Sequence, residues 1–234
     1  MIDKKNYKIA YFSMEIALEQ GIKTYSGGLG ILAGDILRSA ADLKLPMIGV
    51  TLISRHGYFE QRINKQGEQE EIPATDYDFS KLEKIKETAE IVIENKKIKI
   101  AAWIYKIQSP DGFEIPVFLL DTDLPGNPSE YRELTNELYG RDKNWRLLQE
   151  MVLGRGGYNL LKKLGFEIRK FHINEGHGSF VAVAKFLDLK NDDLELEVSR
   201  LTIHLWRQIE LASARLYKQD SSLEPKWWYL TSYH

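Results

Sequence analysis

The stretch Tyr25-Ser26-Gly27-Gly28-Leu29-Gly30 leads directly into apolar residues at the spacing of an amphipathic helix. These apolar residues are Leu29, Leu32, Ala33, Ile36, Leu37, Ala40 and Leu43. Pro46 stops the helix, because proline cannot continue the helical hydrogen-bond ladder. The apolar run 8–13 before the glycines and the β-branched run 47–54 after the helix both predict buried strands. The sequence therefore predicts a strand, glycine turn, helix, strand unit and an α/β fold class.

The middle of the chain has a different pattern. Apolar runs at 91–93, 98–107 and 113–120 are separated by segments of turn-forming residues. The two separating segments are Asn95-Lys96-Lys97 and Ser109-Pro110-Asp111-Gly112. We expect a β-hairpin or meander inserted between helical units, while the charged clusters 68–71 and 81–86 indicate solvated faces.

Helical periodicity returns after Pro128. It is weak over 131–139, strong from Trp145 to Val152, and can extend to Leu164 across three glycines. A strand at 170–173 and a helix at 179–189 follow.

The composition excludes several classes of protein. A chain of 234 residues, 43% of them hydrophobic, can hold one large α/β domain or two small ones. A net charge of −2 leaves no basic excess for a nucleic-acid partner, and the lack of cysteine excludes disulfides and thiolate chemistry. No apolar segment resembles a signal peptide or a membrane span, so we expect a cytoplasmic protein without membrane contact.

Glycines at the start of a helix can form an anion site. Their backbone N–H groups and the helix N-terminus attract negative charge, and glycine lets a phosphate approach the main chain closely. The stretch is neither a Walker loop nor a Gly-x-Gly-x-x-Gly motif. A glycine-rich connection is equally often only a tight turn, so phosphate binding and a simple turn both stay open here.

Two polar segments end predicted strands, where open α/β sheets place ligands. In His172-Ile173-Asn174-Glu175-Gly176-His177 the histidines are five apart, unlike the i, i+4 pair of a helical zinc site, so we expect no metal. Hydrogen bonding to a polyol or an anion suits this segment, with strand-end capping as the structural alternative. Asp121-Thr122-Asp123 offers the paired acids of a glycosidase, but carboxylates two residues apart more often cap a turn, and we favour that role.

Seven segments, taken in order, resemble the α-glucan (glycogen or starch) phosphorylases, especially the short bacterial and archaeal type. They are Ala10-Tyr11-Phe12-Ser13-Met14-Glu15, Tyr25-Ser26-Gly27-Gly28-Leu29-Gly30-Ile31-Leu32-Ala33-Gly34-Asp35, Gly57-Tyr58-Phe59-Glu60-Gln61-Arg62-Ile63, Leu119-Leu120-Asp121-Thr122-Asp123, Leu138-Tyr139-Gly140, Arg146-Leu147-Leu148-Gln149-Glu150 and His172-Ile173-Asn174-Glu175-Gly176-His177. Each motif alone is weak, but their order and spacing hold over about residues 7–190.

The resemblance implies a fold, a reaction and a site. The fold is GT-B, two Rossmann-like domains facing across a cleft, of which this chain would carry an incomplete N-terminal one. The reaction is a glycosyl transfer that uses pyridoxal phosphate to move glucose between an α-1,4-glucan end and phosphate. The resemblance places the amides of Gly27, Gly28, Leu29 and Gly30 against phosphate groups, Tyr11 close to the cofactor, and Glu175 and His177 in the glucose pocket.

The chain also departs from the family. Members are more than twice as long, and their cofactor lysine and phosphate-gripping basic residues lie in a C-terminal domain. We therefore expect no complete catalytic set and no turnover by this chain alone. An exposed cleft face would also favour self-association into a homo-oligomer.

The last part of the chain differs most. The family continues with a His-Thr-Pro-Val run, whereas this chain reads Leu201-Thr202-Ile203-His204-Leu205-Trp206-Arg207-Gln208. One permitted coding sequence for these residues, read two bases later, encodes Asn-His-Thr-Pro-Val-Glu-Ala. We hypothesise a frame change near Ser199, with a phosphorylase domain at 1–198 and an out-of-frame tail at 199–234, so His204 is given no glucose-binding role.

Two other functions stay open. Starch and glycogen synthases share a Gly-Gly-Leu-Gly loop, but they usually carry a lysine before it and acidic residues after it. Here Ser26 precedes the loop and Ile31-Leu32-Ala33 follows it. The third interpretation is an inactive remnant that binds glucan or a sugar phosphate.

Overall fold

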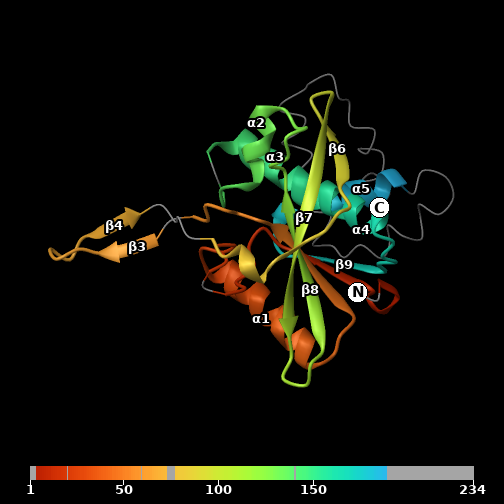
Figure 1. Cartoon of the computed structure of the whole chain (residues 1–234), viewed down its shortest axis with the longest axis horizontal. Coiled ribbons are helices and arrows are strands. Elements are labelled where there is room, and N and C mark those ends of the chain that lie inside the picture. The colour runs from red at the N-terminus through yellow and green to blue at the C-terminus, as the bar shows by residue number, and fades with distance from the viewer. Residues whose placement is uncertain (1–3, 20, 59, 73–76, 140, 189–234) are drawn as a thin grey trace, which may run out of the picture.

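The computed structural model (Figure 1) contains a mixed sheet in which the two strands of the predicted strand–helix–strand unit are parallel neighbours. The structure describes residues 4–19, 21–58, 60–72, 77–139 and 141–188. The expected domain boundary, the tail 199–234 with His204, and the end of the predicted helix at 189 lie outside these residues. Within them, no helix is long and apolar enough to cross a membrane.

Four parallel strands build the core of the sheet, in the order β8-β2-β1-β9. They are β1 (Ile9–Phe12), β2 (Met47–Leu52), β8 (Glu114–Asp121) and β9 (Lys170–Ile173). Helix α1 (Gly28–Asp42) connects β1 to β2, as predicted. All six residues of β2 are buried, which matches its continuous apolar sequence and its place between two parallel neighbours.

The predicted meander strands form, although β7 already begins within the predicted turn 95–97, and they are part of the same sheet. β7 (Lys96–Gln108) pairs antiparallel with β5 (Glu83–Lys84), β6 (Ala89–Ile93) and β8. The β6–β7 turn has left-handed backbone at Glu94 and Asn95, the geometry of a tight hairpin. The expectation of an inserted unit is therefore wrong for β8, which pairs with β2 in the parallel core.

A second, separate sheet consists of the hairpin β3 (Glu60–Ile63) and β4 (Gln69–Ile72), which stands out from the body in Figure 1. The cluster 68–71 is exposed on it, as expected of a solvated face.

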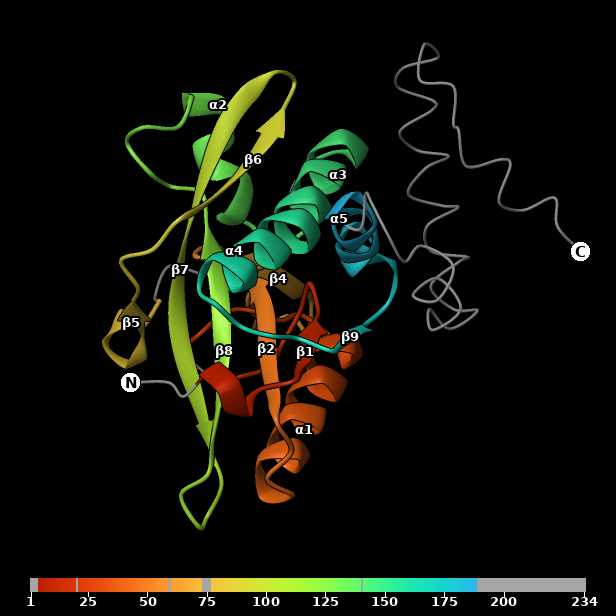
Figure 2. The same cartoon turned by 90° about the vertical axis from the view of Figure 1, so that its right-hand side faces the viewer.

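The remaining helices form a group apart from α1 (Figure 2). α3 (Lys143–Met151), a π-helical turn at Val152–Gly156 and α4 (Gly157–Lys163) follow one another without a break, which confirms the predicted extension. The glycines allow close packing: a Cβ on Gly157 would lie 2.7 Å from the Phe12 ring. The other elements are α2 (Ser129–Arg132), α5 (Phe180–Asp188) and the 3-10 turns Lys4–Asn6, Phe79–Lys81, Glu133–Thr135 and Gly176–Gly178.

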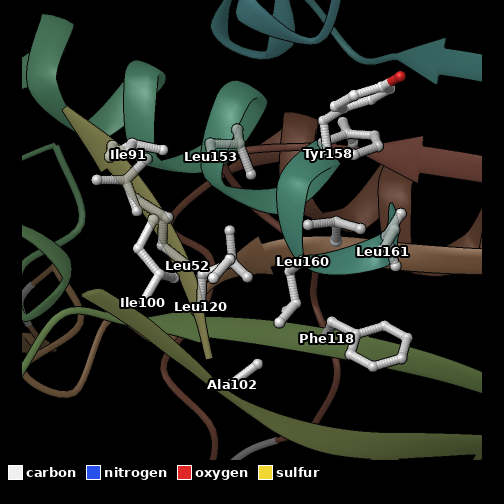
Figure 3. Packing of buried hydrophobic residues seen from close by; sticks show 14 of the residues in the cluster. Leu52, Ile91, Ile100, Ala102, Phe118, Leu120, Leu153, Tyr158, Leu160 and Leu161 are labelled. Carbon is white, nitrogen blue, oxygen red and sulfur yellow. The ribbon is translucent and has the colours of Figure 1, made fainter. Parts of the chain in front are cut away.

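The core has two layers, one on each face of the sheet. Alternate residues of the strands pack under α1, among them Tyr11, Val117 and Leu119. The residues between them pack under the other helices, as Figure 3 shows for Leu52, Phe118 and Leu120 against Leu153, Leu160 and Leu161. Because α1 follows β1 and α5 follows β9 on opposite faces, the carboxyl ends of β1 and β9 form a switch point of the kind where open sheets bind ligands.

Candidate functional site

The glycine stretch lies at this switch point, at the N-terminus of the 15-residue helix α1. Gly27 is the N-cap residue and provides no capping side chain. Its carbonyl accepts from the N–H groups of Gly30 and Ile31, whereas those of Gly28 and Leu29 have no partner among the described residues. A Cβ at Gly27 or Gly28 would meet nothing within 4 Å. The loop thus presents open amide donors at the positive end of a helix.

Glu15 holds this loop in place. Its side chain is buried, at 3% exposure, and its Oε2 accepts from the N–H of Ser26 at 2.8 Å and of Gly27 at 3.1 Å. Space is tight on this side of the loop, because a Cβ at Gly30 would lie 2.4 Å from that of Tyr25 and 3.1 Å from that of Glu15. Glu15 lies in the first of the seven family-like segments, but the sequence alone predicted no role for it.

Tyr139 completes the hydrogen bonding of Glu15. Its hydroxyl donates to Oε1 of that carboxylate. The pKa of Tyr139 is raised far above its ordinary value, mainly because the hydroxyl is buried and secondly because it donates this hydrogen bond. The backbone of Tyr139 is left-handed, with φ at 58°, which costs about 1–2 kcal/mol for a residue with a side chain. Such strain persists only where surrounding contacts hold it.

Arg146 connects Tyr139 to the end of β9. Its Cζ lies 4.6 Å from the centre of the Tyr139 ring, and its Nη2 donates to Nε2 of His177. The Tyr139 and His177 ring centres are 5.7 Å apart. Two predicted site elements, the glycine loop and His177, are therefore joined through Glu15, Tyr139 and Arg146, residues that sequence reasoning placed in motifs without a role.

The end of β9 is also fastened to β1 and α1. The Asn174 N–H donates to the Phe12 carbonyl at 2.8 Å, and its Nδ2 donates to Ser13 Oγ and to the Leu29 carbonyl. The next residue, Glu175, is exposed and has a left-handed φ of 59°. Its carboxylate makes no hydrogen bond or ion pair within the described part of the chain, so it is open to a ligand.

Tyr11 lies in β1, fully buried on the α1 face. Its ring stacks on His172 with centres 4.8 Å apart, and its hydroxyl has no hydrogen-bond partner in the structure. Burial raises the pKa of Tyr11 to about 12, and partial desolvation lowers the pKa of His172 below its usual value. No contact found among the described residues joins Tyr11 to the glycine loop or to His177. Its placement beside a cofactor stays a prediction.

The acid pair Asp121 and Asp123, at the end of β8, has a structural role. Asp121 is fully buried, and Arg55 donates to both of its oxygens, at 2.9 and 2.5 Å. Trp103 Nε1 and the N–H of Asp123 also donate to it. The side chain of Asp123 pairs with Arg132 at 2.6 Å. These contacts confirm the capping role and leave Asp121 no free oxygen for catalysis.

The described residues hold no group of three or more histidine, aspartate or glutamate side chains placed to bind a metal ion.

Comparison with known proteins agrees with the motifs, although no family model matches. The chain is 36% identical to the glycogen phosphorylase of Mycobacterium tuberculosis over 198 residues, which cover 79% of this chain and 22% of that protein. It is 35% identical to the maltodextrin phosphorylase of Thermococcus litoralis over 181 residues, covering 74% and 21% of the two chains. For the glycogen phosphorylase of Aquifex aeolicus the identity is 35% over 190 residues, covering 77% and 26%.

The chain therefore spans only a fifth to a quarter of the length of these curated relatives. Identity at this level over three quarters of the chain confirms the resemblance drawn from the seven motifs. The chain is a partial, phosphorylase-like segment, homologous to part of the glycogen and maltodextrin phosphorylases.

Proposed function

We propose that this chain supplies the phosphate- and glucose-facing wall of an α-1,4-glucan phosphorylase. Such a glycosyltransferase moves glucose from a glucan end to phosphate and forms glucose 1-phosphate. The observation that carries the proposal is the pair of open amides, Gly28 and Leu29, connected through side chains to His177. The α/β sheet is consistent with part of the N-terminal Rossmann-like domain of a GT-B enzyme.

The roles follow from the chemistry of each group. The open amides of Gly28 and Leu29 and the dipole of α1 favour an anion without adding a bulky side chain, whereas the N–H groups of Gly27 and Gly30 already donate within the loop region. Neutral donors suit a site where a substrate phosphate and a cofactor phosphate must lie close together. The carboxylate of Glu175 and the imidazole of His177 are suited to hydrogen bonds with glucose hydroxyls. No glycosidase-type acid pair is needed, in keeping with the closed contacts of Asp121.

Pyridoxal phosphate is the cofactor that the family resemblance implies. The buried hydroxyl of Tyr11, which has no partner in the described part of the chain, and the open space over Gly27 and Gly28 fit a bound cofactor. Here the amides of the loop would face phosphate and Tyr11 would lie near the cofactor. When bound, the cofactor supplies a phosphate that exchanges a proton with the substrate phosphate.

The first test is activity. We expect the 234-residue chain, mixed with maltodextrin, phosphate and pyridoxal phosphate, to bind ligand without forming glucose 1-phosphate. The reason is that the family's cofactor lysine lies outside the matched segment. A yellow preparation that makes glucose 1-phosphate would contradict this expectation, and it would also exclude an inactive remnant.

The second test removes one amide. Gly28→Pro deletes the N–H at the first position of α1, where proline is well tolerated, and the preceding Gly27 is extended, as a residue before proline should be. Gly28→Ala is the matched control, since it adds a Cβ but keeps the N–H. We expect the proline variant to bind phosphate about tenfold more weakly than the alanine variant, by titration calorimetry. Equal affinities would remove the amide from the proposed site.

A further inference from the structure

Tyr139 lies between the two ends of the proposed site. Its hydroxyl donates to Glu15, and Glu15 holds the glycine loop. Its ring packs against the guanidinium of Arg146, which donates to His177. Tyr139 therefore contacts a supporting residue of each ligand-binding element. The side chain uses different parts for the two contacts, so they can be separated by substitution.

The hydroxyl contact determines how firmly the loop is held. Glu15 uses Oε2 for the N–H groups of Ser26 and Gly27, and only Tyr139 donates to its Oε1 among the described residues. Without that donor, the described contacts that restrain rotation of the carboxylate about its last bond are those on Oε2, chiefly the two N–H groups. Its hold on the loop then weakens, and with it the orientation of the open amides of Gly28 and Leu29.

We propose that Tyr139 is a positioning residue that couples the two ligands, so that an anion on the glycine loop and a sugar at His177 bind more tightly together than alone. This inference rests on the proposed function. The cause is shared order: the first ligand immobilises the connected side chains, and the second meets a site that is already ordered. The coupling is reciprocal, because each ligand must change the affinity of the other by the same factor.

The test uses the full chain, with inorganic phosphate and glucose as probes. Tyr139→Phe removes the hydroxyl and keeps the ring on Arg146. Tyr131→Phe is the matched control. Tyr131 lies in α2, and its hydroxyl also donates to a glutamate, Glu94, at 2.8 Å. We expect saturating phosphate to tighten glucose binding about fivefold or more in the wild type and in the control, and less than about twofold in Tyr139→Phe.

Each other outcome has one meaning. Coupling that survives in Tyr139→Phe, or that disappears equally in Tyr131→Phe, overturns the role of Tyr139. A wild type that binds both probes independently overturns the coupling and leaves the proposed function standing. A wild type that binds neither probe overturns the proposed function and the coupling with it.

Hydrogen exchange gives a readout without ligand. The backbone amides of the peptide 25–30 should exchange faster in Tyr139→Phe than in the wild type or in Tyr131→Phe. Equal exchange in all three proteins would show that the hydroxyl does not hold the loop, and would overturn the inference whatever the binding data.

Discussion

Two buried carboxylates lie at or just beyond the ends of parallel strands of the same sheet, and their surroundings differ in a way that distinguishes a structural role from a binding role. Asp121, at the end of β8, receives both arms of a guanidinium, an indole N–H and a backbone N–H. Glu15, three residues after β1, receives backbone amides and a tyrosine hydroxyl, and no lysine or arginine in the described structure pairs with it.

The consequence is a difference in what remains open. Arg55 and Trp103 engage both oxygens of Asp121, which leaves this carboxylate no free oxygen for a ligand. Glu15 fixes the first part of a loop whose next two amides stay free. A buried acid neutralised by a cation therefore anchors the fold here, whereas one held by neutral donors orients a binding loop.

The largest effect on stability is expected at Asp121 and the residues that donate to it. Asp121→Asn should lower the free energy of unfolding by about 3 kcal/mol or more, because it leaves the half-buried Arg55 without its counter-charge. Asp123→Asn is the control, since its pair with Arg132 is more exposed and worth about 1 kcal/mol or less. Urea denaturation of both variants measures the difference. Equal losses would mean that Asp121 is not an anchor.

A smaller difference in stability is expected between substitutions at Gly30, which is packed, and at Gly28, which faces open space. Gly30→Ala should lower the free energy of unfolding by about 1–3 kcal/mol, because the new Cβ is forced against Tyr25 and Glu15. Gly28→Ala should be near neutral, because its Cβ projects into open space. If both substitutions lower the free energy of unfolding equally, by thermal or chemical unfolding, the loop does not have one packed side and one open side.

The smallest effect concerns the hydroxyl of Tyr11, which has no hydrogen-bond partner among the described residues. Tyr11→Phe should change the free energy of unfolding at neutral pH by less than about 1 kcal/mol, since no hydrogen bond is lost.

The pH dependence of Tyr11 has a definite sign. Its pKa is raised from 10 to about 12, so the folded state favours the neutral phenol, and this contribution to stability is present below pH 10 and lost as the pH rises toward 12. Denaturant titrations should therefore show a shallower alkaline loss for Tyr11→Phe. An identical alkaline profile would mean that Tyr11 does not contribute to the loss of stability at high pH.

Local pattern accounts for the parts of the fold that could be predicted. The helix after the glycines and the strand β2 follow from apolar spacing, and all of β2 is buried. The predicted apolar face of the helix is buried at Ala33, Leu37 and Ala40, but Leu32 and Leu43 are exposed, and Leu43 lies beyond the last residue of α1. The position of β8 could not be predicted, since strand order depends on pairing with β2, far away in the chain. The hairpin β3–β4 escaped prediction because β4 is polar on both faces and carries no alternating pattern.

The site shows the same division. The glycine loop and His177 have local signatures, a turn before a helix and a polar strand end. Their connection does not, because the Tyr139–Glu15 contact spans 124 residues and the Arg146–His177 contact 31. Spacing within a motif contains no information about such contacts, so the family resemblance marked the segments and the folded chain supplied their partners.

The projecting hairpin β3–β4 offers a site for attaching a label. Its tip is held by Asn64, whose side chain accepts from the N–H groups of Gln66 and Glu68, and Gln66 itself is exposed. Because the sequence contains no cysteine, Gln66→Cys would introduce a unique thiol on a sheet separate from the ligand-facing one. A dye or spin label attached there would report tumbling and association of the chain without touching the groups that bind.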